Sequence, residues 1–332
     1  MLSLFVLSLG CGETLVVDGI RDIQNLPLNG NTCLNVHQSW KTADVPEKYA
    51  HLVESWRDER VRNVLWTDQG NLDLVEHFYI EWSAHYSRLL NLPMYSGGNV
   101  MASDWARLLY IHKFGGLYVD LDYEAHVSPA DWPVISLQFF TQREVNPLFF
   151  VKSPFLITEV MQNSLVYSPE PGHPFLYAAC RSIVNTLDFI EHPYCPDDQE
   201  RTVGSAVSAK CPLTGAFSNP WTKSVTWLMK TEQITGPPVL DKTFTELSLA
   251  KDSIVESVHA LPTSDFFGTV GSSSIGPGKY ATHWHANSWV TLNPVRLMPE
   301  LTITLLLLFL VVFAGAFFAG KNERLIRNLC SA

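Results

Sequence analysis

Two acidic residues in a short apolar segment give the strongest chemical signal in this chain of 332 residues. The segment, residues 115–122, reads GGLYVDLD and predicts a glycine break followed by a strand. Side chains alternate along a strand, so Tyr118, Asp120 and Asp122 share one face, and the two aspartate Cα atoms lie roughly 7 Å apart. No basic residue stands beside them in the segment. Because such a pair is costly without a cation, we expect a divalent metal ion that carries phosphates.

A helix expected over residues 99–114 comes directly before this strand and ends at the glycine pair. Asp104 and Arg107 are three residues apart, so they share one face of that helix. Charges from the helix and charges from the strand are therefore aimed at one neighbourhood. The plainer alternative for Asp104 and Arg107 is a surface ion pair, which contributes little.

The upstream segments alternate between strand and helix patterns, which predicts an α/β sheet. Ligands of such sheets gather at the carboxyl ends of strands, and Trp40 and Asp68 both follow predicted strands. Trp40 is expected to stack on a nucleobase, with a core tryptophan as the alternative. Asp68 is expected to cap its strand end rather than bind a ligand. We expect strands at residues 33–36, 61–66 and 149–151, and helices at residues 45–56, 72–79, 81–90 and 175–190.

Charge and cysteine content restrict the class of protein. The net charge of −10 argues against a nucleic-acid partner, although a nucleotide needs only a local site. Six cysteines are present without a CxxC spacing, so a structural zinc site is not expected. Cys195 and Cys211 bracket a loop and can pair in an oxidising compartment.

An uncharged run near the carboxyl terminus predicts a membrane anchor. Residues 301–320 read LTITLLLLFLVVFAGAFFAG, and at about 1.5 Å per residue they cover roughly 30 Å, one hydrocarbon core. We place the transmembrane helix at residues 299–320. The basic residues that follow predict a cytosolic tail at residues 321–332, with the bulk of the chain on the opposite side. Residues 1–30 form an N-terminal segment whose apolar start is a weak signal, a clipped anchor or a first strand.

Together these motifs resemble glycosyltransferase family 32, the sugar transferases with an Asp-x-Asp motif. The string Asp104-x-x-Arg107, Gly115-Gly116, Asp120-x-Asp122 at this spacing is the specific part of the likeness. The family often has Thr-Gly-Pro where this chain has Thr214-Gly215-Ala216. Other matching positions are His37-x-x-Trp40-Lys41, Pro46, Asn163, His173-Pro174 and residues 283–289.

The resemblance implies a GT-A fold, a Rossmann-like nucleotide-sugar-binding domain, over residues 31–295. It also implies a retaining transfer that uses Mn²⁺ or Mg²⁺. Asp122 would hold the metal and the diphosphate, and Asp120 would contact the ribose and support the metal. Asp104 and Arg107 would hold hydroxyls of the donor sugar and orient the acidic strand.

The closing segment of the family supplies further expected contacts. Ser288 and Trp289 would reach over the diphosphate of the donor. His283 and His285 are two residues apart, and one of them would be a third metal ligand; we assign His285. A buried structural histidine is the alternative.

Within the family the likeness extends to mannosyltransferases that modify inositol phosphorylceramide, which also carry membrane helices after the catalytic domain. It therefore implies transfer of mannose from GDP-mannose to a membrane lipid by a Golgi enzyme with a luminal catalytic domain. An accessory subunit is a further expected partner. The alternatives are another nucleotide sugar with a glycan acceptor, and a catalytically inactive partner of another transferase.

Overall fold

The structure is a computed structural model. The chain divides into residues 1–285 and residues 286–332, and every described residue belongs to the first unit. The predicted membrane helix and tail, and the cysteines Cys195 and Cys211, lie outside the described residues. In the described part of the chain, no helix combines the length and the apolar character needed to cross a membrane. The structure describes residues 11–30, 33–91, 98–133, 147–152, 161–191, 234–266, 269–270 and 275–284.

A seven-stranded sheet in the order β1-β3-β2-β4-β7-β6-β8 forms the centre of the fold. Within it β7 is antiparallel to both of its neighbours, whereas every other pair is parallel. The predicted α/β class is therefore confirmed. The strands are β1 (Thr14–Val17), β2 (Leu34–Ser39), β3 (Val61–Trp66), β4 (Gly116–Val119), β6 (Leu148–Lys152), β7 (Met161–Ser168) and β8 (Val258–Leu261).

Smaller strands form two separate pairs. One joins β5 (Tyr123–Ala125) to β11 (Ala281–His283), and the other joins β9 (Thr269–Val270) to β10 (Ile275–Gly276). The β5–β11 pair brings a segment late in the chain beside the residues that follow β4. This pairing brings His283 beside Asp122.

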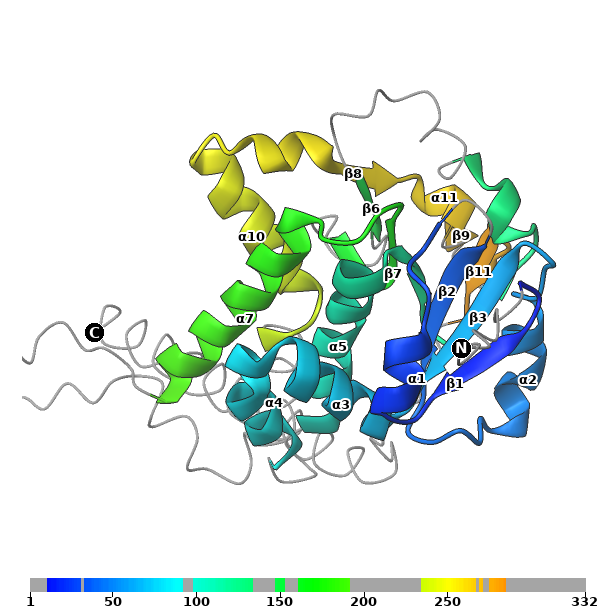
Figure 1. Cartoon of the computed structure of the whole chain (residues 1–332). Coiled ribbons are helices and arrows are strands. Elements are labelled where there is room, and N and C mark those ends of the chain that lie inside the picture. The colour runs from blue at the N-terminus through cyan, green and yellow to red at the C-terminus, as the bar shows by residue number, and fades with distance from the viewer. Residues whose placement is uncertain are drawn as a thin grey trace, which may run out of the picture. The chain divides into compact units, whose positions relative to one another are not determined.

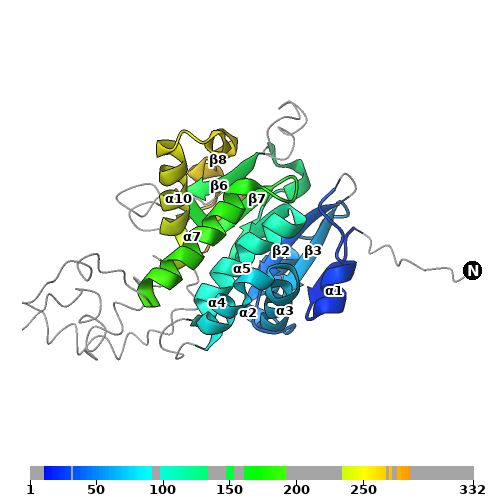
Figure 2. The ribbon, with the colours of Figure 1, turned by 60° about the vertical axis from the view of Figure 1, so that its left-hand side comes forward.

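Helices cover both faces of the large sheet. Figures 1 and 2 show α3, α4, α5 and α7 grouped along one face, where they share a hydrophobic core with alternate strand residues. A second core on the other face joins the β5–β11 pair, α11 and Trp56, two residues after the end of α2. The helices are α1 (Ile20–Asn25), α2 (Glu47–Glu54), α3 (Asp68–Phe78), α4 (Ser83–Leu90), α5 (Gly98–Phe114), α7 (Pro174–Glu191), α10 (Pro237–Leu249) and α11 (Thr263–Phe266).

The acidic segment departs from its prediction. Strand β4 ends at Val119, because the backbone N–H of Tyr123 bonds to the carbonyl of Asp120 at 3.1 Å and closes a turn. The chain then leaves the large sheet and continues as β5 against β11. A strand running through Asp122 was therefore the wrong prediction, although the turn still keeps Asp120 and Asp122 together.

The glycine pair before β4 is required by the backbone. Gly115 has φ +66° and Gly116 has φ +97°, conformations that side chains with a Cβ rarely adopt. A Cβ at Gly116 would also lie 2.4 Å from the carbonyl oxygen of Asn35 on β2. These glycines allow α5 to end and β4 to start directly against β2.

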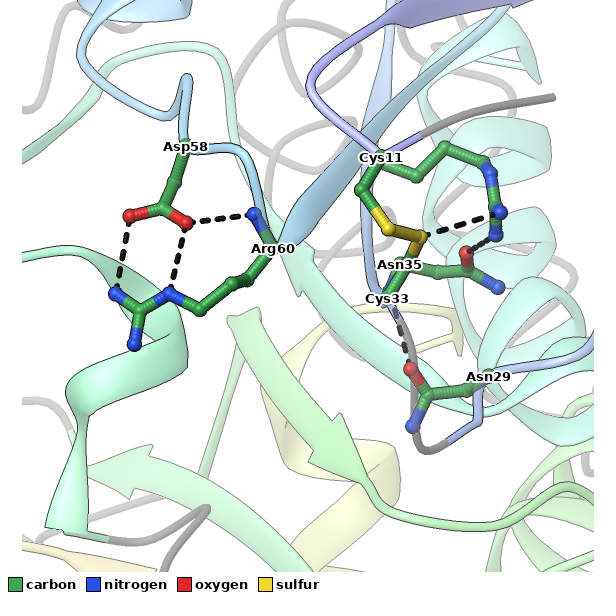
Figure 3. Close-up of a disulfide and its surroundings, with 7 residues drawn as sticks. Cys11, Asn29, Cys33, Asn35, Asp58 and Arg60 are labelled. Atoms are coloured by element: carbon green, nitrogen blue, oxygen red, sulfur yellow. Dashed lines mark hydrogen bonds and ion pairs between the residues drawn. A yellow bond between two sulfur atoms is a disulfide. The ribbon is translucent and has the colours of Figure 1, made fainter.

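A disulfide joins Cys11, just before β1, to Cys33, just before β2. Figure 3 shows it beside Asn35, whose backbone N–H bonds to the side-chain oxygen of Asn29 at 3.0 Å. Both cysteines precede their strands, so the bond lies at the amino ends of β1 and β2. It constrains the end of the sheet opposite to the edge where β4 delivers its acids. The sequence had singled out a different pair, Cys195 and Cys211.

His37 on β2 connects the sheet to the glycine pair. The Trp66 indole N–H donates to His37 Nδ1 at 3.0 Å, and His37 Nε2 lies 3.0 Å from the Gly115 carbonyl oxygen. An indole nitrogen can only donate, so Nδ1 accepts and Nε2 carries the proton given to Gly115. Burial lowers the pKa of His37 to about 4; the bond to Gly115 opposes this shift and Arg62 adds to it. The ring is therefore neutral near pH 7.

This pKa predicts an acid-sensitive fold. Because the pKa of His37 falls from 6.5 to about 4 on folding, its contribution is present above pH 6.5 and is lost as the pH drops toward 4. The full loss is on the order of 3 kcal/mol. Thermal unfolding of the full chain between pH 4 and pH 7.5 should show a smaller pH dependence for His37→Gln than for the wild type. His77→Gln, at an exposed helix position, is the control. Equal pH dependence of wild type and His37→Gln would contradict this role.

Candidate active site

The acidic residues lie where ligands of α/β sheets bind. From β2 the chain runs through α2 to β3 on one side of β2, and it later returns to β4 on the other side. The order of strands thus reverses between β2 and β4, and ligands bind outside the carboxyl ends of strands at such a point. Trp40 follows β2 there, and Asp120 follows β4.

Arg107 on α5 holds Asp120 from the neighbouring helix. Its Nη1 lies 3.2 Å from Asp120 Oδ1 and its Nη2 lies 3.0 Å from Asp104 Oδ1. Nη1 also donates to the backbone carbonyl of Asn163 on β7 at 3.2 Å. The acidic segment itself carries no basic residue, but the helix supplies one to Asp120, as expected from the helix and strand charges aimed at one neighbourhood. The surface alternative for Asp104 and Arg107 is also wrong, because both side chains are buried.

Burial and charge act together on this group. Burial raises the pKa of Asp104 to about 6; Arg107 opposes that shift and Asp120 adds to it. Burial also raises the pKa of Asp120, against the charge of Arg107 and with the charge of Asp122. For Arg107 burial disfavours the charged form, yet its acidic neighbours raise its pKa overall. The Arg107 guanidinium therefore stays charged, whereas burial disfavours the ionised forms of Asp104 and Asp120.

The backbone and two hydroxyl groups fix the acids further. The N–H of Asp120 bonds to the carbonyl of Ser164 on β7 at 3.0 Å, which extends the β4–β7 pairing by one residue. The Tyr118 hydroxyl donates to Asp120 Oδ1 at 2.8 Å. The buried Thr235 hydroxyl donates to Asp104 Oδ2 at 3.3 Å.

Thr235 was missed from the sequence, although a signal was available. Residues 235–237 read Thr-Gly-Pro, the tripeptide that the family resemblance associates with this fold. The expectation fell instead on Thr214-Gly215, which lies outside the described residues. A threonine that contacts Asp104 belongs to the site by its position.

A histidine joins the second acid. His283 Nε2 lies 3.1 Å from Asp122 Oδ1, and its ring stacks on Tyr123 at a centroid distance of 4.4 Å and an interplanar angle of 2°. The β5–β11 pairing sets this contact, because Tyr123 and His283 are partners in its register. The backbone N–H of Trp284 also bonds to the Asp122 carbonyl at 2.9 Å.

One ligand atom each from Asp120, Asp122 and His283 lies within 4.8 Å of the others. Carboxylate oxygens with one imidazole nitrogen suit a first-row divalent ion such as Mn²⁺ better than Ca²⁺, which prefers oxygen ligands alone. Charge points the same way, since among the described residues Arg107 contacts Asp104 and Asp120, and Asp122 lies in the same group as Asp120. When all three acids are ionised, a divalent cation balances the remainder.

Of the other expected donor and metal contacts, the structure describes Trp40 but not the residues after position 284. Trp40 is half-buried, its backbone N–H bonds to the Trp66 carbonyl at 2.9 Å, and its ring lies 5.7 Å from that of Tyr49. Trp40 thus lies directly after β2, beside the point where the strand order reverses. His285, Ser288 and Trp289 lie outside the described residues, so the assignments of a metal ligand and of donor contacts to them stay predictions.

Comparison with known proteins finds partial sequence similarity to mannosyltransferases. The chain is 26% identical over 166 residues to inositol phosphoceramide mannosyltransferase 1 of Schizosaccharomyces pombe, covering 48% of this chain and 44% of that protein. It is 32% identical over 89 residues to mannosyltransferase 3 of the same yeast, covering 26% of this chain and 23% of that protein. The alignments thus span less than half the length of these relatives. No family model matches the chain.

Solved structures give weaker likenesses. The PaToxG glycosyltransferase aligns with a TM-score of 0.39 and 13% identity, over 68% of this chain and 73% of that one. The ligand-free glycosyltransferase domain of the YGT toxin aligns with a TM-score of 0.37 and 11% identity, over 69% of this chain and 80% of that one. By sequence, this chain is similar over less than half of its length to inositol phosphoceramide mannosyltransferases.

Proposed function

We propose that this chain is a membrane-anchored, metal-dependent glycosyltransferase of GT-A fold. It transfers mannose from GDP-mannose to inositol phosphorylceramide and retains the anomeric configuration. The observation that carries the proposal is the convergence of Asp120, Asp122 and His283 at the switch point of the sheet, beside the buried Arg107. The kinship to inositol phosphoceramide mannosyltransferases supports the choice of donor and acceptor.

The residues divide the work by position. Asp122 and His283, with Asp120, would hold a divalent cation, and such an ion would supply positive charge for the diphosphate leaving group. Arg107 fixes the Asp120 carboxylate and Asp104 fixes Arg107, so the ligand atoms are positioned before the donor arrives. Asp120 also faces the ribose of the donor in this proposal, and Trp40 lies against the base.

The expectation that Asp104 and Arg107 hold sugar hydroxyls is modified in this proposal. Both guanidinium Nη atoms of Arg107 already contact Asp104, Asp120 and the Asn163 carbonyl. Their main role is therefore to position Asp120. Contacts with the sugar would come from atoms of these side chains that are not used in the contacts among Asp104, Arg107 and Asp120.

Two features support a luminal enzyme. The apolar run at residues 301–320 is long enough to span a bilayer, and its basic flank predicts a cytosolic tail. The Cys11–Cys33 disulfide is typical of proteins that fold in an oxidising compartment. We therefore place the catalytic domain in the Golgi lumen, where a membrane lipid is within reach of a tethered site.

The donor and the acceptor are tested with the full chain in membranes. We expect release of mannose from GDP-mannose, dependent on Mn²⁺, in preference to release of sugar from UDP-glucose, UDP-galactose or UDP-N-acetylglucosamine. Addition of inositol phosphorylceramide should convert release into mannosylated lipid, detected by mass spectrometry. Turnover of a UDP-sugar in place of GDP-mannose would overturn the donor, and mannose transfer only to a glycan would overturn the acceptor.

Loss of either acid should abolish transfer. Asp120→Asn and Asp122→Asn each remove a charged cation ligand while keeping the side-chain shape, so kcat should fall by about a thousandfold or more. Asp188→Asn is a matched control, since Asp188 also pairs with a histidine, His85 at 2.8 Å, but on the surface. Transfer rates and thermal unfolding are measured together. Retained turnover in a folded Asp122→Asn protein would argue against the proposal.

Loss of Arg107 should affect both stability and activity. Arg107→Gln leaves the buried Asp104 and the half-buried Asp120 without their cation, so the free energy of unfolding should fall by about 3–5 kcal/mol. Arg107→Lys keeps the charge but not the fork that spans both acids, so it should recover stability in part and activity less. Thermal unfolding and transfer assays at saturating Mn²⁺ provide the readouts. An Arg107→Gln protein with wild-type stability would contradict the assigned role.

A further inference from the structure

Asp68 lies at the same edge of the sheet as the acidic pair, on the other side of β2. In the β2–β3 register Ser39 is paired with Trp66, and Asp68 is the second residue beyond that pair. The β4 residue that pairs with His37 is Tyr118, so Asp120 emerges near the level of Ser39. Asp68, the end of β2 and Asp120 therefore form a row along the carboxyl edge of three adjacent strands.

Asp68 lies in the first turn of α3 but is not the cap of that helix. The sequence predicted that it caps the strand end, but the cap belongs to Thr67, whose hydroxyl accepts from the Gly70 N–H at 3.1 Å. Asp68 is exposed, and within the described residues its carboxylate accepts no hydrogen bond. Burial nevertheless raises the pKa of Asp68, and the charge of Lys41 opposes this shift.

Two backbone bonds bring the segment that holds Asp68 beside the segment that holds Trp40. The N–H of Trp40 bonds to the Trp66 carbonyl at 2.9 Å, and the N–H of Asp68 bonds to the Lys41 carbonyl at 3.3 Å. The segment after β2 and the segment after β3 are thus paired beyond the end of the sheet. Trp40 therefore precedes the residue whose carbonyl accepts from Asp68, and the two lie on adjacent segments.

The spacing of the row matches a nucleoside diphosphate. Two strand separations of about 4.8 Å put the end of β3 roughly 10 Å from the end of β4. That distance is comparable to the length of a nucleoside. A donor whose diphosphate lies at Asp120 and Asp122 therefore extends its base past Ser39 and Trp40 toward Asp68.

The chemistry of a carboxylate then selects among bases. An ionised carboxylate only accepts hydrogen bonds. Guanine offers two adjacent donors, N1–H and the N2 amino group, which match its two oxygens. Uracil offers one donor, N3–H, between two carbonyl oxygens that a carboxylate repels. An acid at this position therefore favours a guanine nucleotide over a uracil nucleotide.

We propose that Asp68 reads the Watson–Crick edge of guanine in the donor nucleotide, with Trp40 against the face of the base. This inference rests on the proposed function, since it assumes that Asp120 and Asp122 hold the diphosphate. It adds the residue that sets the choice of nucleotide. The cation site and the base site are thus separate parts of one row, and a substitution can alter either without the other.

The test measures binding of GDP and UDP to the full chain by calorimetry in the presence of Mn²⁺. Asp68→Asn should lower GDP affinity by roughly ten- to a hundredfold, the loss expected for hydrogen bonds to a charged group, and should leave UDP affinity unchanged or higher. Trp40→Leu should weaken both nucleotides by similar factors. Glu76→Gln, an exposed acid further along α3, should change neither.

The outcomes separate this inference from the proposed function. If the wild type binds GDP but Asp68→Asn keeps the same GDP-to-UDP ratio, the base-reading role is wrong and the proposed function stands. If the wild type binds neither nucleotide with Mn²⁺, the proposed function fails and the inference fails with it. Retained UDP binding by Asp68→Asn, together with an unchanged unfolding temperature, shows that the variant is folded.

Discussion

The buried guanidinium of Arg107 is the interaction on which the candidate site depends. It contacts Asp104 on its own helix and Asp120 at the end of β4, and it also donates to the backbone of β7. Carboxylates so close together and partly removed from water would otherwise repel each other and remain protonated. Arg107 neutralises part of that charge, and Asp122 is paired instead with His283. The remaining negative charge is what makes a divalent cation a suitable guest.

The rest of the fold keeps this group in place from several directions. The glycine pair brings α5 and β4 into direct succession, so Asp104 and Arg107 come from the helix that immediately precedes the acids. The His37 side chain donates to the carbonyl of Gly115 in the glycine pair. The backbone N–H of Asp120 donates to a carbonyl of β7. The β5–β11 pair then adds a histidine from far along the chain. Local order and long-range pairing are both needed to assemble the site.

The sequence predicted the parts of this arrangement that depend on local pattern. The α/β class, the helix that carries Arg107 and the strand at residues 61–66 follow from periodicity and flanking residues. It also indicated that the helix charges and the strand acids meet, but not which acid Arg107 contacts, because that depends on how the helix lies over the sheet. Strand β7 was also missed, since its polar residues, among them Asn163, disrupt the apolar pattern of a buried strand.

Long-range placement decided the remaining differences. The choice between His283 and His285 could not be made from a spacing of two residues, and the register of β11 against β5 brings His283 to Asp122. The threonine that contacts Asp104 lies 131 residues further along the chain, so no local signal connects the two. Asp68 was predicted to cap the end of its strand. In the structure the hydroxyl of Thr67 forms the cap, because it accepts from the Gly70 N–H.

Binding of Mn²⁺ to the full chain, followed by electron paramagnetic resonance with and without GDP, tests the central claim most directly. Our account predicts a single ion per chain whose affinity rises when GDP is present. His283→Gln should weaken that binding by roughly tenfold or more, as expected for the loss of a metal ligand. Absence of Mn²⁺ binding in the presence of GDP, or binding that is unchanged when Asp120 and Asp122 are both replaced by asparagine, would contradict it.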